Sequence, residues 1–416
     1  MFRFVNKVIV ILVLLVCFGF KQISAQDSLR IMYYNLLNYP GSSSERVAYF
    51  RTITHYVKAD ILLVNELLND EGAVTLLEDG LNAYGNRSFK KAAFTDGPNT
   101  NNMLFYDSTK VTLYSQDSII TDLRLIDEYV LFSNKISNDT TFLYLYSAHL
   151  KASSGSVNEQ KRLAEVREFK KWVDDKTEIE NIFFGGDLNF YSFNEPAYDT
   201  LIYYGVHPLN DPLLAGNWHN NALFSDIHSQ STRTDQFGGG ASGGLDDRFD
   251  FIFYSDDVID GTNGATYVAN SCKIIGNDGN HFDVAIIDPP VNTAVPDSVL
   301  QALYYMSDHL PVICDIDLKD ITEIKEKGKA NRKVKVFPNP TSKRCTVSFD
   351  GVTGQTKISL FNGFGAVLRT EQINIDGNMR QMELDLSDLK NGVYYFSVIG
   401  ADFAESVKII VCGALD

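Results

Sequence analysis

The sequence places acidic side chains at or near the ends of its most apolar stretches. Four such carboxylates would repel one another, and would be costly to desolvate, unless a cation lay between them. Carboxylate-rich oxygen ligation suits Mg²⁺, Mn²⁺ or Ca²⁺ better than zinc. The four carboxylates are Glu66, Asp187, Asp250 and Asp308, and the polar residues Asn35, His149, Asn189 and His309 occupy comparable positions. The pattern therefore predicts a divalent-cation site at the ends of strands.

The step Asp308-His309 sets a metal ligand beside a candidate general base. In the run Arg248–Phe253, a period of two residues puts Asp250 on the face opposite the phenylalanines. Asp250 can then orient the imidazole of His309, fix its tautomer and stabilise its charged form. Each residue taken alone has an ordinary structural explanation, since strand-end carboxylates are usually solvated and lone histidines usually pack. Their combination favours catalysis.

The elements that must position these residues alternate apolar, strand-like runs with polar loops. Several runs are apolar throughout, which indicates strands buried on both faces. One helix is well marked, because Ser156 and Glu159 match a capping box and apolar residues recur at helical spacing as far as Val173. The mixture predicts sheets sandwiched by helices. The expected strands are Leu29–Leu36, Asp60–Leu67, Asn102–Tyr106, Thr140–Leu150, Asn181–Gly185, Arg248–Ser255 and Leu310–Leu318.

The amino terminus has the pattern of a secretory signal peptide over residues 1–25. Arg3 and Lys7 precede the apolar run Val8–Phe20, and Ala25 offers a small residue for cleavage. The alternative, a transmembrane anchor, needs about 20 apolar residues, more than this run supplies. No later segment is long enough to span a bilayer.

Composition and net charge further limit the classes of function that this protein can have. The chain has 416 residues, of which 44% are hydrophobic and 22% charged, and this is typical of a globular protein. Removing residues 1–25 would leave 34 of the 37 basic residues against 53 acidic ones, a formal net charge of −19. Such a charge disfavours a passive binder of polyanions. It does not disfavour an enzyme that meets one phosphate through a metal ion.

The remaining four cysteines, Cys272, Cys314, Cys345 and Cys412, fit no zinc-binding spacing, and we expect them to be structural, with their pairing open. The glycine-rich run Phe237–Gly244 is expected to be a mobile loop, because it lacks the ending of a phosphate-binding P-loop.

The amino-acid composition of the chain changes after Asp320. Residues 319–334 are rich in lysine and arginine and have little apolar periodicity, so we expect an exposed linker. Beyond it, short strands alternate with glycine and asparagine turns, which predicts a small antiparallel β-sandwich. Its expected strands are Thr346–Phe349, Lys357–Phe361, Ala366–Ile375, Gln381–Leu386, Gly392–Ile399 and Ser406–Val411.

Six motifs, in order, carry a family resemblance over residues 28–318. They are Asn35, Glu66, His149, Gly186-Asp187-Leu188-Asn189, Arg248-Phe249-Asp250 and Ser307-Asp308-His309. With this order and spacing the segment resembles the endonuclease/exonuclease/phosphatase superfamily, which has the DNase I-like fold. The resemblance implies a four-layer α/β sandwich, in which two packed β-sheets are flanked by helices. It also implies hydrolysis of phosphoesters with a divalent metal, Mg²⁺ or else Mn²⁺ or Ca²⁺.

The resemblance also implies roles for individual residues. Glu66 resembles the principal metal ligand, with Asn35 and Asp308 nearby, some of them acting through water. Asp187 and Asn189 resemble the residues that hold the nucleophilic water and the phosphate oxygens.

The two histidines take separate roles by the same resemblance. His309, paired with Asp250, resembles the base or the phosphate-stabilising acid, and His149 resembles an acid toward the leaving oxygen. One departure stands out, because Asn102 occupies a position where nuclease members often have a tyrosine that contacts phosphate.

Three cations near these motifs are candidates for binding substrate. Lys151 follows His149, Arg162 falls on the following helix, and Arg233 lies in Ser231-Thr232-Arg233. Each can equally be an ordinary surface charge. Trp218 can stack on a base or pack in the core, and packing is slightly favoured.

The carboxyl-terminal segment, residues 335–416, has a resemblance of its own. Val336-Phe337-Pro338-Asn339-Pro340-Thr341 and Asn391-Gly392-Val393-Tyr394-Tyr395-Phe396 resemble the type A sorting domain of the type IX secretion system. This implies export through the periplasm, recognition by the type IX machinery at the outer membrane, and a secreted or cell-surface protein. The ending Cys412–Asp416 departs from the usual lysine-rich strand. The alternative is a generic carbohydrate-binding or fibronectin-like sandwich.

The leading hypothesis is a secreted, metal-dependent phosphodiesterase, specifically a nuclease that acts on extracellular nucleic acid. A second hypothesis keeps the chemistry and changes the substrate to a phospholipid, as in sphingomyelinase-like relatives, or to a phosphomonoester. A third is a non-catalytic binding module on the same fold. A groove lined by Lys151, Arg162 and Arg233 would favour a polynucleotide, whereas an exposed apolar β-hairpin beside the site would favour a lipid.

Overall fold

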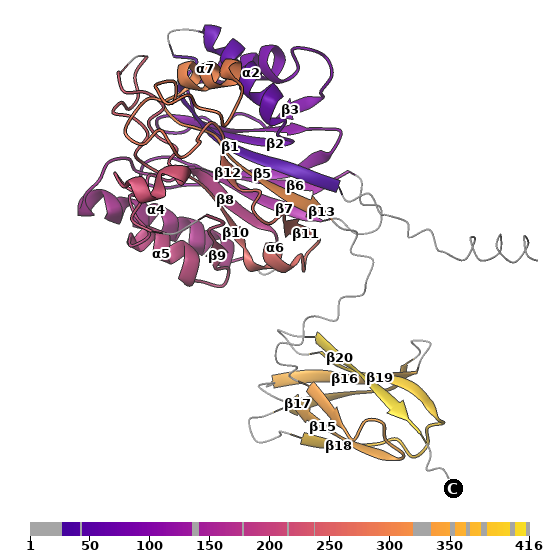
Figure 1. The fold of residues 1–416 in the computed structure, drawn as a ribbon. Coiled ribbons are helices and arrows are strands. Elements are labelled where there is room, and N and C mark those ends of the chain that lie inside the picture. Colours follow the sequence, from indigo (N-terminus) through magenta and orange to yellow (C-terminus); the bar gives the residue numbers. More distant parts are fainter. Residues whose placement is uncertain are drawn as a thin grey trace, which may run out of the picture. The chain divides into compact units, whose positions relative to one another are not determined.

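The computed structural model divides the chain into two compact units, Met1–Thr322 and Glu323–Asp416 (Figure 1). The structure describes residues 27–41, 44–134, 141–176, 179–213, 216–236, 238–318, 334–349, 354–362, 367–375, 381–399 and 404–412. The expected signal peptide and nearly all of the expected linker lie outside these residues. Within the described ranges, no helix is both long and apolar enough to cross a membrane.

The first unit contains a seven-stranded sheet built around a parallel pair, β1 (Asp27–Tyr39) and β2 (Ile61–Leu67). The strand order is β11-β13-β1-β2-β4-β3, and β12 also pairs with β13. The run Ile61–Val64 is buried throughout, which explains its continuous apolar character. The other strands are β3 (Phe89–Lys91), β4 (Asn101–Asp107), β11 (Ala265–Tyr267), β12 (Lys273–Ile274) and β13 (Val312–Leu318).

A second sheet of six strands has the order β5-β6-β7-β8-β10-β9. Its central pair, β7 and β8, is parallel, and its other neighbouring strands are antiparallel. The strands are β5 (Val111–Ile119), β6 (Ile126–Ser133), β7 (Phe142–His149), β8 (Ile182–Asp187), β9 (Leu209–Asn210) and β10 (Asp250–Ser255).

The two sheets pack face to face between helices, so the predicted four-layer α/β sandwich is confirmed (Figure 1). One apolar cluster joins Ile31 and Leu63 of the first sheet to Leu145 and Phe183 of the second. Helices α2 (Val47–Val57) and α7 (Asp297–Met306) flank the first sheet, and α4 (Ser156–Asp174) and α5 (Pro196–Tyr203) flank the second. Shorter helical segments are η1 (Ser44–Arg46), α3 (Asp70–Thr75), η2 (Leu76–Leu81), η3 (Ala222–Ile227) and α6 (Asp256–Asp260).

Helix α4 occurs at the predicted position, but the predicted capping box is wrong. Ser156 is already the first helical residue, and the cap position is Gly155, which has no side chain to bond to the helix. Gly155 has a φ of 97°, a conformation that glycine adopts without steric penalty. The backbone of a glycine, not a serine hydroxyl, therefore starts this helix.

The strand directions bring the predicted site residues to one edge of the sandwich. The parallel pairs β1–β2 and β7–β8 end together, with Asn35 opposite Asn65 and His149 opposite Asp187. Strand β10 runs antiparallel to β8 and begins there, with Asp250 opposite Asp187. Strand β13 is antiparallel to β1, so the residues just before β13 reach the same edge.

The second unit has its own apolar core, which includes Val347, Leu360 and Phe396. It contains a three-stranded sheet of order β14-β15-β18 and a four-stranded sheet of order β17-β16-β19-β20, all antiparallel. The predicted small β-sandwich is therefore present. Its strands are β14 (Val334–Phe337), β15 (Arg344–Phe349), β16 (Gly354–Asn362), β17 (Val367–Ile375), β18 (Gln381–Asp385), β19 (Gly392–Ile399) and β20 (Ala404–Val411).

The four cysteines in the described part of the chain are free thiols. Cys272, Cys314 and Cys345 are buried, and Cys412 is exposed. Trp218 is fully buried, and its indole N–H donates to the carbonyl oxygen of Phe190 at 2.8 Å, so its packing role is confirmed.

Candidate active site

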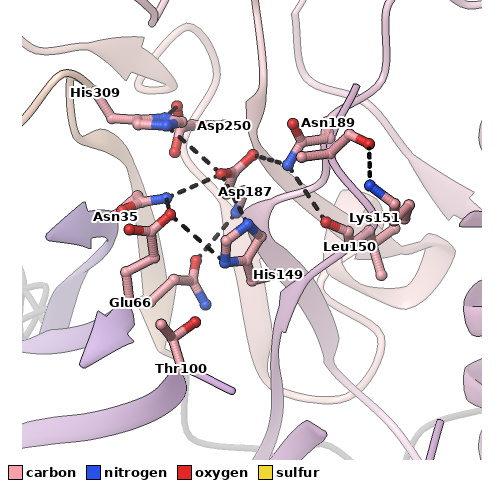
Figure 2. A network of polar contacts seen from close by, with 12 residues as sticks. Asn35, Glu66, Thr100, His149, Leu150, Lys151, Asp187, Asn189, Asp250 and His309 are labelled. Atoms are coloured by element: carbon pink, nitrogen blue, oxygen red, sulfur yellow. Dashed lines mark hydrogen bonds and ion pairs between the residues drawn. The ribbon is translucent and has the colours of Figure 1, made fainter. Parts of the chain in front are cut away.

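Asp187, the last residue of β8, is the centre of a buried polar network (Figure 2). Its Oδ2 accepts a hydrogen bond from Nδ2 of Asn35 at 2.9 Å, and its Oδ1 accepts one from Nδ2 of Asn189 at 2.7 Å. The Asn35 amide also donates to Oε1 of Glu66 at 3.1 Å, which links carboxylates of the two sheets. Burial, together with the nearby carboxylates of Asp250 and Glu66, raises the pKa of Asp187 to about 7.

The backbone at this edge holds two site residues in the left-handed region. Glu66 has a φ of 58° and Asn189 a φ of 54°. Asparagine tolerates this region comparatively well, but for most other residues it costs roughly 1–2 kcal/mol. The side chain of Glu66 is fixed in return by the N–H of Asn38, which donates to Oε2 at 2.9 Å. Strain of this kind is concentrated at functional sites, and here it sets the direction of a carboxylate.

His309 is held from behind by a buried carboxylate. Its Nδ1 lies 2.8 Å from Oδ2 of Asp250, and its Nε2 lies 3.5 Å from Oδ2 of Asp187. Burial acts to lower the pKa of His309, but the carboxylates of Asp250, Asp187 and Asp308 outweigh it and raise that pKa well above its ordinary value. These carboxylates favour the charged form of His309, and Asp250 orients its ring as predicted from the sequence.

The pKa of His149 is shifted in the opposite direction to that of His309. Nε2 of His149 lies 3.4 Å from Oδ2 of Asp187, and its Nδ1 lies 3.9 Å from Oε1 of Glu66. Burial, and then the positive charge of Arg124, lowers the pKa of His149 well below its ordinary value. The ring is neutral at neutral pH, the state in which an imidazole nitrogen can bind a metal ion. Two histidines with pKa values moved in opposite directions are typical of a catalytic site.

Glu66, His149 and Asp187 fit the requirements of a divalent cation. Each offers one ligand atom, and the three atoms lie within 4.8 Å of one another. Nδ1 of His149 is buried and has no hydrogen-bond partner in the described part of the protein, so it is available as a ligand. The two carboxylates suit Mg²⁺ or Mn²⁺, whereas the imidazole is a ligand that transition metals accept more readily than Mg²⁺ does.

The other two predicted metal ligands are placed differently. Asn35 turns its amide nitrogen toward the carboxylates, because its Oδ1 accepts the N–H of Leu37 at 2.9 Å. Asp308 is not one of the three grouped residues; its Oδ2 accepts the N–H of Ala241 at 2.6 Å, and its Oδ1 is buried and unbonded in the described structure. A side chain at Gly240 would place a Cβ only 2.6 Å from that Oδ2, which explains the glycine there.

Two of the three cations predicted to bind substrate are structural instead. Arg162 is fully buried, and its guanidinium donates to both carboxylate oxygens of Glu195, at 2.7 and 2.9 Å. Arg233 is 1% exposed and donates to the carbonyl oxygen of Tyr304 at 3.0 Å. Lys151 is only partly buried, and its Nζ donates to the carbonyl oxygen of Ala152 at 2.8 Å. The predicted basic groove is therefore not formed by these three residues.

Asn65 is a site residue that the sequence analysis missed. Its Oδ1 accepts the backbone N–H of Asp187 at 3.0 Å, and its Nδ2 donates to Asn102 at 2.7 Å and Ser147 at 3.1 Å. Asn102 is thus buried behind the site, not directed at a phosphate. At Gly186 a Cβ would lie 2.7 Å from Oδ1 of Asn65, so only glycine allows this approach.

Gln230 and Arg124 were also missed. Nε2 of Gln230 lies 2.6 Å from Nε2 of His309, and Nη1 of Arg124 donates to the carbonyl oxygens of His149 and Leu150 at 3.2 and 3.3 Å. Neither residue lies in an apolar run next to an acid, so the strand-end pattern had no means of finding it.

Glu165 of α4 supports the loop after His149, and it should make stability depend on pH. Its Oε2 accepts the N–H of Lys151 at 2.9 Å, and burial raises its pKa from 4.5 to about 7. Between these values the folded protein holds a proton that the unfolded chain has lost, so this contribution to stability falls as pH rises. Between pH 5 and pH 8 we expect the unfolding free energy of the native protein to decrease more than that of Glu165→Gln. The difference between the two decreases should be at most about 3 kcal/mol.

Urea unfolding at the two pH values measures that effect, and Glu168→Gln, an exposed change on the same helix, is the control. An identical pH slope in the native protein and Glu165→Gln would contradict the expectation.

A four-layer sandwich with carboxylates and imidazoles gathered where strands of both sheets end is the architecture of the DNase I-like proteins. The chain belongs to the endonuclease/exonuclease/phosphatase family, whose model matches residues 32–309. The model of the secretion system C-terminal sorting domain matches residues 335–412, which indicates export across the outer membrane. Both resemblances drawn from the sequence are thereby confirmed.

Several solved structures are similar to this chain. A family member from Bacteroides thetaiotaomicron is 13% identical, with a TM-score of 0.44, and the match covers 71% of this chain and 99% of that one. The human Nocturnin catalytic domain is 17% identical, with a TM-score of 0.45 and coverage of 71% and 98%. D. rerio TDP2, complexed with a single-strand DNA product, is 15% identical, with a TM-score of 0.46 and coverage of 70% and 99%. No curated protein matches the sequence.

Proposed function

We propose that this chain is a divalent-metal-dependent phosphodiesterase that works outside the cell. The observation that carries the proposal is the meeting of Glu66, His149 and Asp187, whose ligand atoms lie within 4.8 Å of one another. Nε2 of His309, whose charged form the neighbouring carboxylates favour, lies 3.5 Å from the same Asp187 carboxylate. Hydrolysis of a phosphodiester needs a proton acceptor for water, a cation against the phosphate oxygens and a proton donor, and this arrangement offers all three.

Glu66, His149 and Asp187 would hold the metal ion. When bound, such an ion would neutralise charge on the phosphate oxygens and favour ionisation of a nearby water. This assignment moves His149 from the acid role expected from the sequence to a ligand role, because its lowered pKa leaves the ring neutral.

The remaining residues position water and phosphate. Asp187 and Asn189, which are joined by a 2.7 Å hydrogen bond, would hold the attacking water, and the Asp187 carboxylate would accept its proton. His309 donates a hydrogen bond to the phosphate, and Asp250 keeps its ring charged and correctly turned. Asn35 and Asn65 fix the carboxylate and the backbone of Asp187.

Removal of metal tests the proposal. With p-nitrophenyl methyl phosphate as substrate, we expect EDTA to abolish hydrolysis, and excess Mg²⁺ or Mn²⁺ to restore it, because water and phosphate would lose the cation that activates them. Release of p-nitrophenol measures the rate. Full activity in EDTA after extensive dialysis would contradict metal dependence, and no hydrolysis with any divalent ion would contradict the activity.

The observations support hydrolysis of a phosphodiester more than they support nucleic acid as the substrate. The predicted basic groove depended on Arg162 and Arg233, which are buried and bonded within the protein.

A further inference from the structure

Two buried cysteines of the first unit lie opposite each other on neighbouring segments of one sheet. Lys273, the first residue of β12, pairs with Ile313 of β13, and the two strands are antiparallel. One step back along β12 is therefore one step forward along β13, which sets Cys272 opposite Cys314. Cys272 is 6% exposed and Cys314 is fully buried, and both are free thiols in this structure.

Hydrogen bonds on the far side of Cys272 show that this register continues past it. Oγ of Ser271 accepts the N–H of Asp315 at 2.9 Å and donates to the carbonyl oxygen of Asp315 at 3.3 Å. The N–H of Cys272 donates to the hydroxyl of Tyr267 at 3.2 Å, as expected where opposite residues share no ladder bond. In such a pair the Cα atoms are about 4.5 Å apart and the side chains approach most closely. A disulfide bond spans Cα separations of about 4.4–6.8 Å, so this pair is within reach of one.

Both thiols lie on the face of the first sheet that packs against the second sheet. Directly opposite residues of an antiparallel pair share a face. Tyr254 of β10, in the second sheet, has a pKa raised first by burial and then by Tyr267 and both cysteines, which places the two thiols beside that ring. Cys272, Cys314 and Tyr254 also belong to one apolar cluster. The two sulfur atoms are therefore directed into the same part of the core.

The route of the protein supplies the conditions for oxidation. The sorting domain indicates export across the outer membrane, and disulfide bonds form and persist in the periplasm and outside the cell. We propose that Cys272 and Cys314 form a disulfide bond in the exported protein. This chooses among the pairings that the sequence left open, and it does not depend on the proposed activity.

The bond would form by exchange with the disulfide of a periplasmic protein oxidant. The thiolate of one cysteine attacks that disulfide and releases one thiol, and the thiolate of the second cysteine then attacks the mixed disulfide and releases the other. The two cysteines lose two electrons and two protons, and the oxidant becomes a dithiol. Burial raises the pKa of Cys272 to about 12, so the folded protein holds little thiolate. The exchange therefore belongs to the stage before the core closes.

The bond would close a segment that carries part of the candidate active site. Helix α7, Asp308 and His309 all lie between the two cysteines in the sequence. Joining the ends of this segment would restrict the unfolded chain and so stabilise the folded protein.

Differential alkylation tests the pairing on the full-length protein after export to the periplasm of a bacterial host. Iodoacetamide in urea labels the free thiols, and N-ethylmaleimide, added after reduction, labels those that had been bonded. We expect N-ethylmaleimide on Cys272 and Cys314. Trypsin cleaves after Lys273, between the two cysteines, so without reduction their peptides should stay joined. Iodoacetamide on these two cysteines, or a bond from either to another cysteine, would overturn the inference.

Variants show whether the linkage is specific. Cys314→Ala should leave Cys272 open to iodoacetamide, whereas Cys345→Ala, which removes a buried thiol of the second unit, should leave the joined peptides unchanged. The labelling is done on unfolded chains, so it does not depend on how well a variant folds.

Urea unfolding with and without a phosphine reductant measures the effect on stability. The reductant should lower the urea midpoint of the native protein by about 1 M and leave that of the double variant Cys272→Ala/Cys314→Ala unchanged. A midpoint lowered equally in both proteins, or in neither, would overturn a stabilising bond between these cysteines.

Discussion

Replacing His309 with alanine is expected to lower kcat for a chromogenic phosphodiester by about 10²- to 10⁴-fold, the range that a positioned acid or base contributes. The loss would fall on kcat more than on KM, because the imidazolium acts where charge develops on the phosphate. Asp250→Asn should have a large effect of its own, since Oδ2 of Asp250 lies 2.8 Å from Nδ1 of His309 and keeps that ring charged. Initial rates over a range of substrate concentrations separate the two constants.

The double variant sharpens this prediction. If Asp250 acts through His309, adding Asp250→Asn to His309→Ala should lower kcat little further. His281→Ala is a matched control, because His281 is also buried and its Nδ1 lies 2.8 Å from a carboxylate oxygen of Asp278, outside the group around Asp187. Once rates are corrected for folded protein, His281→Ala should retain activity. Full additivity of the two site substitutions would contradict the proposed pairing.

Replacing Glu66 with glutamine is expected to abolish most of the stabilisation that divalent cations give the folded protein. A ligand at 100 times its dissociation constant stabilises a protein by about 2.7 kcal/mol, and a neutral amide at position 66 would weaken binding enough to remove most of this. Thermal unfolding with and without Mn²⁺ measures the effect without relying on activity. Hydrolysis should fall in parallel.

Glu71→Gln provides the control for this experiment. It makes the same change of charge on an exposed residue of the neighbouring helix α3 and should leave the metal-induced shift intact. An equal shift in native protein and Glu66→Gln would show that the cation binds elsewhere, and would remove Glu66 from the proposed ligand set.

The gathering of the candidate site residues at one edge could be predicted from the sequence, because it depends on local patterns. Glu66 and Asp187 each come after a short run of apolar residues, and the buried strands of a parallel pair bring the residues at their carboxyl ends to a common edge. His309 could be paired with Asp250 because the alternation of a strand decides which face a residue occupies. The layered architecture could be predicted from the same runs.

The features that the sequence could not supply depended on distant partners. Arg162 was expected to reach the substrate, but its partner Glu195 is 33 residues away and no local pattern joins the two. The lowered pKa of His149 could not be predicted either, because the burial and the nearby cation that cause it belong to the folded structure.

The left-handed backbone at Glu66 has a consequence for how this protein can change over time. A glycine at that position would relieve the strain, so a lineage that kept only a binding role would gain stability by discarding the glutamate. The chain instead retains a costly conformation together with the carboxylate that it aims. The strained backbone is therefore the stability cost of directing this carboxylate into the candidate site.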